Sequence, residues 1–176
     1  MAASDPVGRN ARMKRRSFLL SLAGAAAAVP GLVRAQSGGA AALLAQTYTD
    51  VHGQSQPLAQ WRGKPMLVNF WATWCAPCVK EMPELDALQR SHPGIQFLGI
   101  AIDSAPNVAK FVAKVPVSYP VLVSGPTAIE VMRGLGNAPG GLPFTVILTA
   151  NGDVKTQFLG VVDVSATEQI LKQLPG

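Results

Sequence analysis

Cysteine and histidine are scarce in this sequence. Its 176 residues contain two of each. Two cysteines are too few for a small fold held together by several disulfides. A zinc site would need two more ligands beside the cysteines, and His52 and His92 are not spaced as a ligand pair. The shortage excludes a disulfide-stapled mini-protein and disfavours a zinc protein.

Long apolar stretches are also lacking. The apolar residues 18–33 are interrupted by glycine and proline and fall short of the roughly 20 residues that span a bilayer. Before them, residues 14–20 (KRRSFLL) resemble a bacterial twin-arginine export signal. After them, residues 33–35 provide the small residues of a cleavage site. We predict that residues 1–35 are a signal peptide cleaved near Ala35. The mature protein would then work in the bacterial periplasm, and the alternative is an uncleaved anchor.

An excess of positive charge is confined to the predicted signal peptide, residues 1–35. Through Ala35 there are six basic residues and one acidic residue, whereas the 141 residues from Gln36 onward carry nine of each sign. A nucleic-acid surface needs Lys and Arg concentrated on the folded domain, so we expect no nucleic-acid partner. The glycines of residues 134–141 do not follow a strand in a phosphate-binding pattern, so we expect no nucleotide.

Apolar patterns predict an α/β domain. Residues 65–71 and 95–102 are near-continuous apolar runs, typical of strands buried on both faces. Between them, residues 77–90 carry apolar side chains at three-residue spacing, which predicts a helix. Strand, helix and strand in this order indicate a βαβ unit with a parallel pair.

The rest of the chain adds helices and a hairpin. We expect helices over residues 107–115, 127–135 and 165–174, and a β-hairpin at Asn151-Gly152. The whole is a single domain with a mixed β-sheet and helices on both faces. It would occupy residues 46–176, after a flexible linker at residues 36–45.

Both cysteines stand at the junction between the first buried strand and its helix, in residues 74–78 (WCAPC). The positive end of the helix stabilises a thiolate at Cys75. Three-residue spacing places Cys78 one turn along, close enough to close a small disulfide ring. The pattern predicts a redox pair in which Cys75 attacks another disulfide and the more buried Cys78 resolves the intermediate.

Two other uses of the cysteines are less favoured. A purely structural disulfide would constrain the unfolded chain little, because the ring is small. A c-type haem attachment site needs His directly after the second cysteine, and Val79 stands there instead.

Two motifs resemble the thioredoxin superfamily. The first is residues 68–78 (VNFWATWCAPC) followed by residues 80–83 (KEMP), and the second is residues 141–145 (GLPFT) followed by Asn151-Gly152. More narrowly, they are similar to the TlpA/ResA-like periplasmic redoxins, from about Gln46 to the C-terminus. The resemblance implies a thioredoxin-like fold and thiol-disulfide oxidoreductase activity. It implies no cofactor beyond the redox-active disulfide of the two cysteines.

The resemblance also implies which residues bind substrate. Pro143 matches the family's cis-proline, which faces the two cysteines. In the family this proline exposes the backbone of the preceding residue, here Leu142, for pairing with an extended substrate segment. Trp74 would form part of the apolar surface beside the reactive sulfur.

Because position 69 carries Asn, Glu81 becomes the candidate for handling the proton of the resolving cysteine. Cytosolic thioredoxins carry a buried Asp at the position of Asn69, which helps to move the proton of the resolving cysteine. Asn cannot titrate, so another group must do this work. Glu81 lies three residues after Cys78 on the same helix face, and TlpA/ResA-like proteins carry a Glu at this place. We predict that Glu81 handles the proton; the alternative is a solvated acid favoured by the helix dipole.

The residues between the cysteines bear on the direction of electron flow. Ala76-Pro77 lacks the histidine that strong oxidants of the family often carry, so we expect a reductant. The family takes electrons from a transmembrane thiol reductase and reduces protein disulfides, such as those of apocytochrome c or of copper sites in oxidase assembly. We therefore predict a monomeric, specific disulfide reductase.

Three alternatives remain beside the reductase. One is a disulfide oxidant or isomerase with the same chemistry. Another is a copper or haem chaperone that uses the cysteines as ligands without turnover. A peroxidase is disfavoured, because Ala72 stands where peroxiredoxins carry a threonine.

Overall fold

The computed structural model describes residues 31–175, and its centre is a seven-stranded sheet in the order β2-β1-β5-β4-β3-β6-β7. The strands are β1 (Thr47–Asp50), β2 (Ser55–Pro57), β3 (Met66–Trp71), β4 (Gln96–Ala101), β5 (Val121–Val123), β6 (Phe144–Leu148) and β7 (Val154–Leu159). The helices are α1 (Gly31–Leu44), α2 (Ala76–Ser91), α3 (Ala105–Val112), α4 (Ala128–Gly134) and α5 (Val164–Lys172). Two 3-10 turns, η1 (Leu58–Trp61) and η2 (Gly125–Thr127), complete the described elements.

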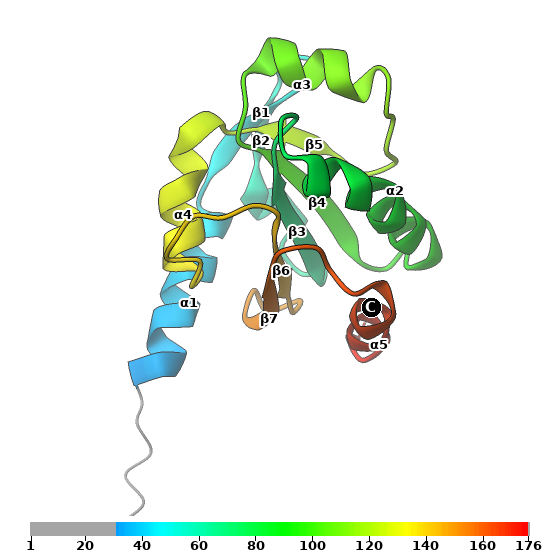
Figure 1. The fold of residues 1–176 in the computed structure, drawn as a ribbon. Coiled ribbons are helices and arrows are strands. Elements are labelled where there is room, and N and C mark those ends of the chain that lie inside the picture. The colour runs from blue at the N-terminus through cyan, green and yellow to red at the C-terminus, as the bar shows by residue number, and fades with distance from the viewer. Residues whose placement is uncertain (1–30, 176) are drawn as a thin grey trace, which may run out of the picture.

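The middle of the sheet is the predicted βαβ unit. Strand β3 pairs in parallel with β4, and α2 connects them. On its other side β3 pairs antiparallel with β6, which continues through the turn at Asn151-Gly152 into β7. Every residue of β3 is buried, as its continuous apolar run predicts. The predicted mixed sheet with helices on both faces is confirmed (Figure 1).

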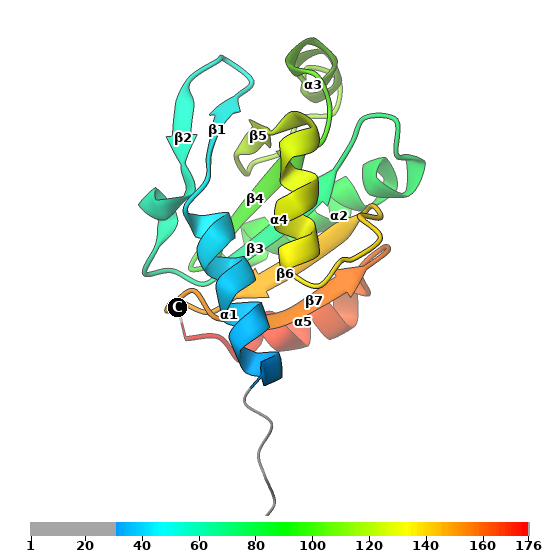
Figure 2. The ribbon, with the colours of Figure 1, turned by 90° about the vertical axis from the view of Figure 1, so that its left-hand side faces the viewer.

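Each face of the sheet has its own core. Helices α1 and α4 lie side by side across one face (Figure 2), and α2, α3 and α5 pack on the other. Because side chains alternate along β3, Phe70 belongs to the first core and Trp71 to the second. The Phe70 ring stacks on Phe144 at 5.8 Å between centroids, and Trp71 packs on Phe111 of α3 at 5.1 Å. Strand β3 is therefore fixed from both sides at the end where the cysteines follow.

Residues 36–45, predicted to be a flexible linker, instead form most of helix α1. Leu43 and Leu44 are buried in the core. The helix also approaches α4 so closely that a Cβ atom on Gly39 would lie 2.1 Å from the carbonyl oxygen of Gly134. Only glycine allows such an approach. The prediction was wrong because a short glycine-containing helix is marginal alone and is stabilised here by packing.

The predicted signal peptide falls almost wholly outside the described residues. Residues 1–30 are not described, so the signal peptide and its cleavage near Ala35 stay predictions. Within residues 31–175, no helix combines the length and the apolar character needed to cross a membrane.

Candidate active site

The junction between β3 and α2 places both cysteines at the start of a helix. Cys75 is the N-cap of α2, and its Sγ accepts a hydrogen bond from the backbone N–H of Cys78 at 3.4 Å. The two cysteines form a disulfide with their Cα atoms 5.3 Å apart. Pro77 lies in the first turn, where its missing N–H would have no partner within the helix. The sulfurs therefore stand at the positive end of α2.

The three residues around the disulfide differ sharply in exposure. Cys78 is fully buried, Cys75 is 6% exposed and Trp74 is 68% exposed. Cys75 is therefore the more accessible of the two cysteines, as its predicted attacking role requires. The Trp74 side chain projects into solvent next to it, where an apolar partner surface can cover it.

Pro143 lies at the same edge of the sheet as the cysteines. Phe144 pairs with Phe70 in the antiparallel ladder, so Pro143 precedes β6 just where β3 runs towards Cys75. The Leu142–Pro143 peptide bond is cis, as the resemblance implies. The Pro143 carbonyl accepts a hydrogen bond from Gly160 N–H at 2.8 Å. Leu142 is half-buried and packs against both cores.

Glu81 is enclosed beneath the start of α2. It is only 1% exposed, which excludes the alternative of a solvated surface acid. Its Oε1 accepts a hydrogen bond from Asn69 Nδ2 at 2.8 Å, and its Oε2 accepts one from the backbone N–H of Val162 at 3.1 Å. Glu81 thereby joins α2, β3 and the loop after β7.

Burial raises the pKa of Glu81 above its ordinary value, and hydrogen bonds from Val162 and Asn69 oppose the rise only in part. A carboxyl group with a raised pKa can exchange a proton closer to neutral pH than an exposed Glu can. Such a group, buried three residues along the helix from a redox cysteine, suits proton transfer during thiol chemistry.

Sequence reasoning missed two contacts of this buried cluster. Thr145 Oγ1 accepts a hydrogen bond from Asn69 Nδ2 at 3.0 Å, and Val162 contributes only its backbone. Thr145 could have been found, since it is a polar residue in an apolar strand two positions after Pro143. Val162 carries no side-chain signal, because any residue other than proline offers the same N–H.

Asp103 was also missed, although it holds the loop before the cysteines. Its Oδ2 accepts hydrogen bonds from the Thr73 hydroxyl at 2.5 Å and from the Thr73 backbone N–H at 3.2 Å. Burial alone would raise the pKa of Asp103, but hydrogen bonds from Thr73, Asn107 and Ser104 hold it below its usual value. The signal was its place two residues after β4, since the carboxyl ends of the parallel strands β3 and β4 meet at one edge.

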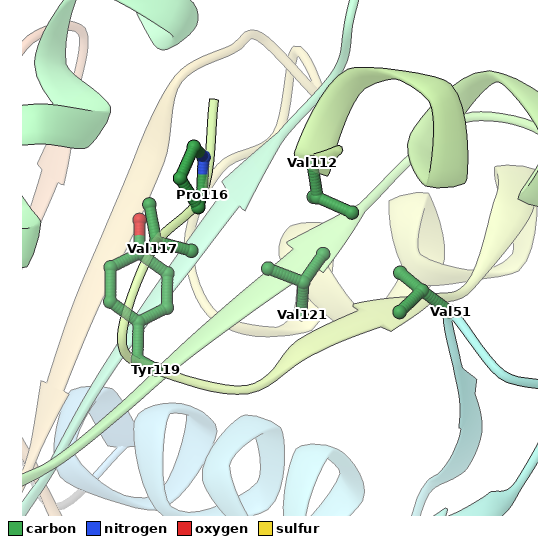
Figure 3. A pocket seen from close by; sticks show the side chains of 6 residues that line it. All are labelled: Val51, Val112, Pro116, Val117, Tyr119 and Val121. Carbon is green, nitrogen blue, oxygen red and sulfur yellow. The ribbon is translucent and has the colours of Figure 1, made fainter. Parts of the chain in front are cut away.

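An apolar hollow of about 210 Å³ opens beside α3 (Figure 3). None of the predicted site residues lines it; its walls are Val51, Val112, Pro116, Val117, Tyr119 and Val121. Apart from the Tyr119 hydroxyl these side chains carry no reactive group. Within the described part of the chain, no three His, Cys, Asp or Glu side chains are placed to hold a metal ion.

A disulfide at a helix N-terminus, next to a cis-proline at the same edge of a central sheet, defines a thioredoxin-like thiol-disulfide protein. The Redoxin family profile matches residues 35–173. The chain belongs to the Redoxin family.

Sequence and structure similarities to known proteins support this assignment. The thiol-disulfide oxidoreductase ResA of Geobacillus thermodenitrificans is 30% identical over 129 residues, which cover 72% of each chain. A thioredoxin-related protein from Neisseria meningitidis serogroup B aligns with a TM-score of 0.65 and 31% identity, covering 72% of this chain and 96% of its own. A thiol:disulfide interchange protein of the thioredoxin family from Chlorobium tepidum aligns with a TM-score of 0.64 and 30% identity, over 74% and 93% of the two chains. The protein is a thiol-disulfide oxidoreductase of the ResA type.

Proposed function

We propose that this protein is an exported disulfide reductase that acts on selected periplasmic proteins. The Cys75–Cys78 dithiol carries the electrons, no further cofactor takes part, and Glu81 handles the proton. Trp74, Leu142 and Pro143 bind the substrate segment next to the attacked disulfide. The observation that carries the proposal is the buried Glu81 carboxyl on the helix that begins at the redox disulfide.

The reaction proceeds through a mixed disulfide. The Cys75 thiolate attacks one sulfur of the substrate disulfide, and the other substrate sulfur leaves as a thiolate that takes up a proton. Cys78 then gives its proton to the Glu81 carboxylate, and its sulfur attacks Cys75. The substrate's second sulfur leaves and is protonated in turn. The substrate gains two electrons and two protons, and the Cys75–Cys78 disulfide is formed.

The residues between the cysteines favour reduction over oxidation. Ala76 and Pro77 offer no charged or hydrogen-bonding side chain to the Cys75 sulfur. A histidine at this place would stabilise the thiolate form further and make the disulfide a stronger oxidant. The helix N-terminus alone gives a more modest stabilisation, so the dithiol keeps its reducing power.

The proposed location rests on the predicted signal peptide, and the proposed partners rest on the family. A signal peptide at residues 1–35 would deliver the protein to the periplasm. A reductant there needs electrons from across the membrane, so we assign a transmembrane thiol reductase as donor. Its substrates would be protein disulfides of the kind formed by haem-binding or copper-site cysteines, and the reductase would act as a monomer.

A reduction assay with matched variants tests the proposal. The substrate is a disulfide-closed peptide that carries the Cys-X-X-Cys-His haem-attachment pattern. The reduced wild type is expected to open it, and Cys75→Ser to leave it closed. Cys78→Ser is expected to accumulate the peptide as a mixed disulfide with Cys75. Undiminished reduction by Cys75→Ser would overturn the proposal, as would failure of the wild type to reduce any protein or peptide disulfide.

A further inference from the structure

The side-chain amide of Asn69 lies at the centre of a buried polar cluster. The residue is 2% exposed. Its Nδ2 donates to Glu81 Oε1 at 2.8 Å and to Thr145 Oγ1 at 3.0 Å, whereas its Oδ1 is buried without a hydrogen-bond partner in the described part of the chain. Leaving a buried carbonyl oxygen unpaired is costly. In this arrangement Asn69 therefore serves only as a donor.

This arrangement suits an ionised Glu81 and conflicts with a protonated one. Both carboxylate oxygens face donors, Asn69 Nδ2 on one side and the Val162 N–H on the other. A protonated carboxyl group must itself donate a hydrogen bond, and neither neighbour accepts one. The backbone N–H of Val162 cannot reverse its role, whereas a primary amide can, because half a turn about its last torsion exchanges oxygen and nitrogen.

Thr145 allows this exchange. Its hydroxyl accepts the bond from Asn69 in the present arrangement, but a hydroxyl can equally donate. If the amide turned over, Oδ1 would take the place of Nδ2. It would then accept one hydrogen bond from protonated Glu81 and another from the Thr145 hydroxyl. Nδ2 would then lie where Oδ1 lies now, a buried place with no hydrogen-bond partner in the described part of the chain, so the turn moves the unpaired position from the amide oxygen to the amide nitrogen.

We propose that the Asn69 amide turns over with the protonation of Glu81, so that both charge states of the carboxyl group are hydrogen-bonded. The inference rests on the proposed proton-handling role of Glu81. When Cys78 loses its proton, Glu81 gains it, and the amide turns from donor to acceptor. When Glu81 releases the proton, the amide turns back. Asn69 is thus a positioning residue that acts through Glu81.

Other titratable groups also act on this carboxyl. Glu84 on α2 raises the pKa of Glu81 by charge repulsion. Tyr119, ahead of β5, has a pKa raised chiefly by its own burial and further by the charges of Asp86 and Glu81. The cysteines titrate only in the reduced protein. The test therefore begins with the disulfide form, in which Glu81 titrates with both sulfurs silent.

The direct test is NMR of the intact wild-type protein in its disulfide form, with labelled glutamate and asparagine side chains. Glu81→Gln identifies the Glu81 carboxyl signal, and Asn69→Asp identifies the Asn69 side-chain amide. As Glu81 is protonated, the Asn69 Nδ2 protons are expected to shift with the same midpoint and to lose their proximity signal to the Thr145 methyl group. An amide that keeps this signal in both charge states would overturn the inference.

A kinetic test separates this inference from the proposed function. Asn69→Asp places a second carboxyl group against Glu81, and two adjacent carboxyls hold one proton to higher pH. The pH profile of mixed-disulfide resolution is then expected to shift relative to that of the wild type. An unshifted profile in Asn69→Asp would overturn the role of Asn69. An undiminished rate in Glu81→Gln would instead overturn the proton role of Glu81, whatever the NMR shows of the amide.

Discussion

Glu81 is the residue with the most direct chemical consequence. It is buried, both of its oxygens accept hydrogen bonds, and burial raises its pKa. Glu84 lies one helical turn further along α2 but is exposed. The two carboxyl groups therefore form a natural pair for experiments, with one inside the protein and the other in solvent.

Replacing Glu81 by Gln should slow resolution of the mixed disulfide. Without a carboxylate to take the Cys78 proton, we expect the rate at neutral pH to fall by roughly 10²-fold or more. Rapid-mixing measurement of peptide release from the Cys75 mixed disulfide checks this. Glu84→Gln should change the rate far less, because Glu84 is exposed and acts on Glu81 only through charge repulsion. An equal loss in both variants would indicate a general charge effect instead.

The raised pKa of Glu81 also predicts a pH dependence of stability. Folding favours the protonated carboxyl, so its contribution is fully present below the unfolded value of 4.5 and is lost as pH rises through the higher folded pKa. The unfolding free energy of the disulfide form should therefore fall relative to Glu81→Gln over that interval. Denaturant unfolding at a series of pH values measures it. If the unfolding free energy of the wild type instead rose relative to that of Glu81→Gln as pH rises, the expected direction would be contradicted.

The sequence predicts the covalent part of the site better than its supporting contacts. Cys75, Cys78 and Pro143 stand in local motifs, and Glu81 was predicted from its helical spacing after Cys78 together with the resemblance to TlpA/ResA-like proteins. Thr145 meets Asn69 only because β6 pairs with β3, with a separation of 76 residues along the chain. Such contacts depend on which distant strands become neighbours in the sheet, and local patterns do not show this.

Among the elements, the segment between β3 and α2 depends on Asp103 beyond the end of β4. Asp103→Ala removes the hydrogen bonds that Thr73 donates. We expect the unfolding free energy to fall by about 1–3 kcal/mol and the Thr73 amide to exchange its hydrogen faster. The exposed Asp153 in the β6–β7 turn is the matched control. Unchanged exchange at Thr73 would show that Asp103 does not hold this loop.

Helix α1 provides a second test, through two adjacent glycines. A Cβ atom on Gly39 would collide with the Gly134 carbonyl, whereas one on Gly38 would meet nothing within 4 Å. Gly39→Ala should therefore destabilise the protein by about 1–3 kcal/mol. Gly38→Ala should stabilise it by roughly 0.5–1 kcal/mol through helix propensity. Thermal unfolding of both variants measures these changes. Equal changes in stability in the two variants would mean that α1 does not pack on α4.

The predictions for the two ends of the domain, a helix over residues 165–174 and a flexible linker over residues 36–45, had different outcomes because the two helices differ in how local their causes are. The helix over residues 165–174 has its own amphipathic pattern, and α5 forms there. Residues 36–45 lack such a pattern, and α1 gains its stability from the core beneath it and from contact with α4. Tertiary packing overrides weak local propensity here, which is why the sequence alone predicts a linker.

At the scale of the whole molecule, the domain combines a neutral charge balance with an exposed apolar group beside its reactive sulfur. From Gln36 onward the chain carries nine basic and nine acidic residues, so long-range attraction by net charge contributes little to substrate choice. Trp74 is the most exposed of the large hydrophobic side chains in the described residues. Selection of substrates should therefore depend on contacts near the disulfide.

The central claim is that the Cys75–Cys78 pair donates electrons. Its reduction potential, measured by equilibrating the purified protein with glutathione or dithiothreitol, tests this most directly. We expect a value near that of thioredoxin, about −270 mV, as a reductase supplied by a membrane donor requires. A value near about −120 mV would make the protein an oxidant and contradict the proposed direction of electron flow.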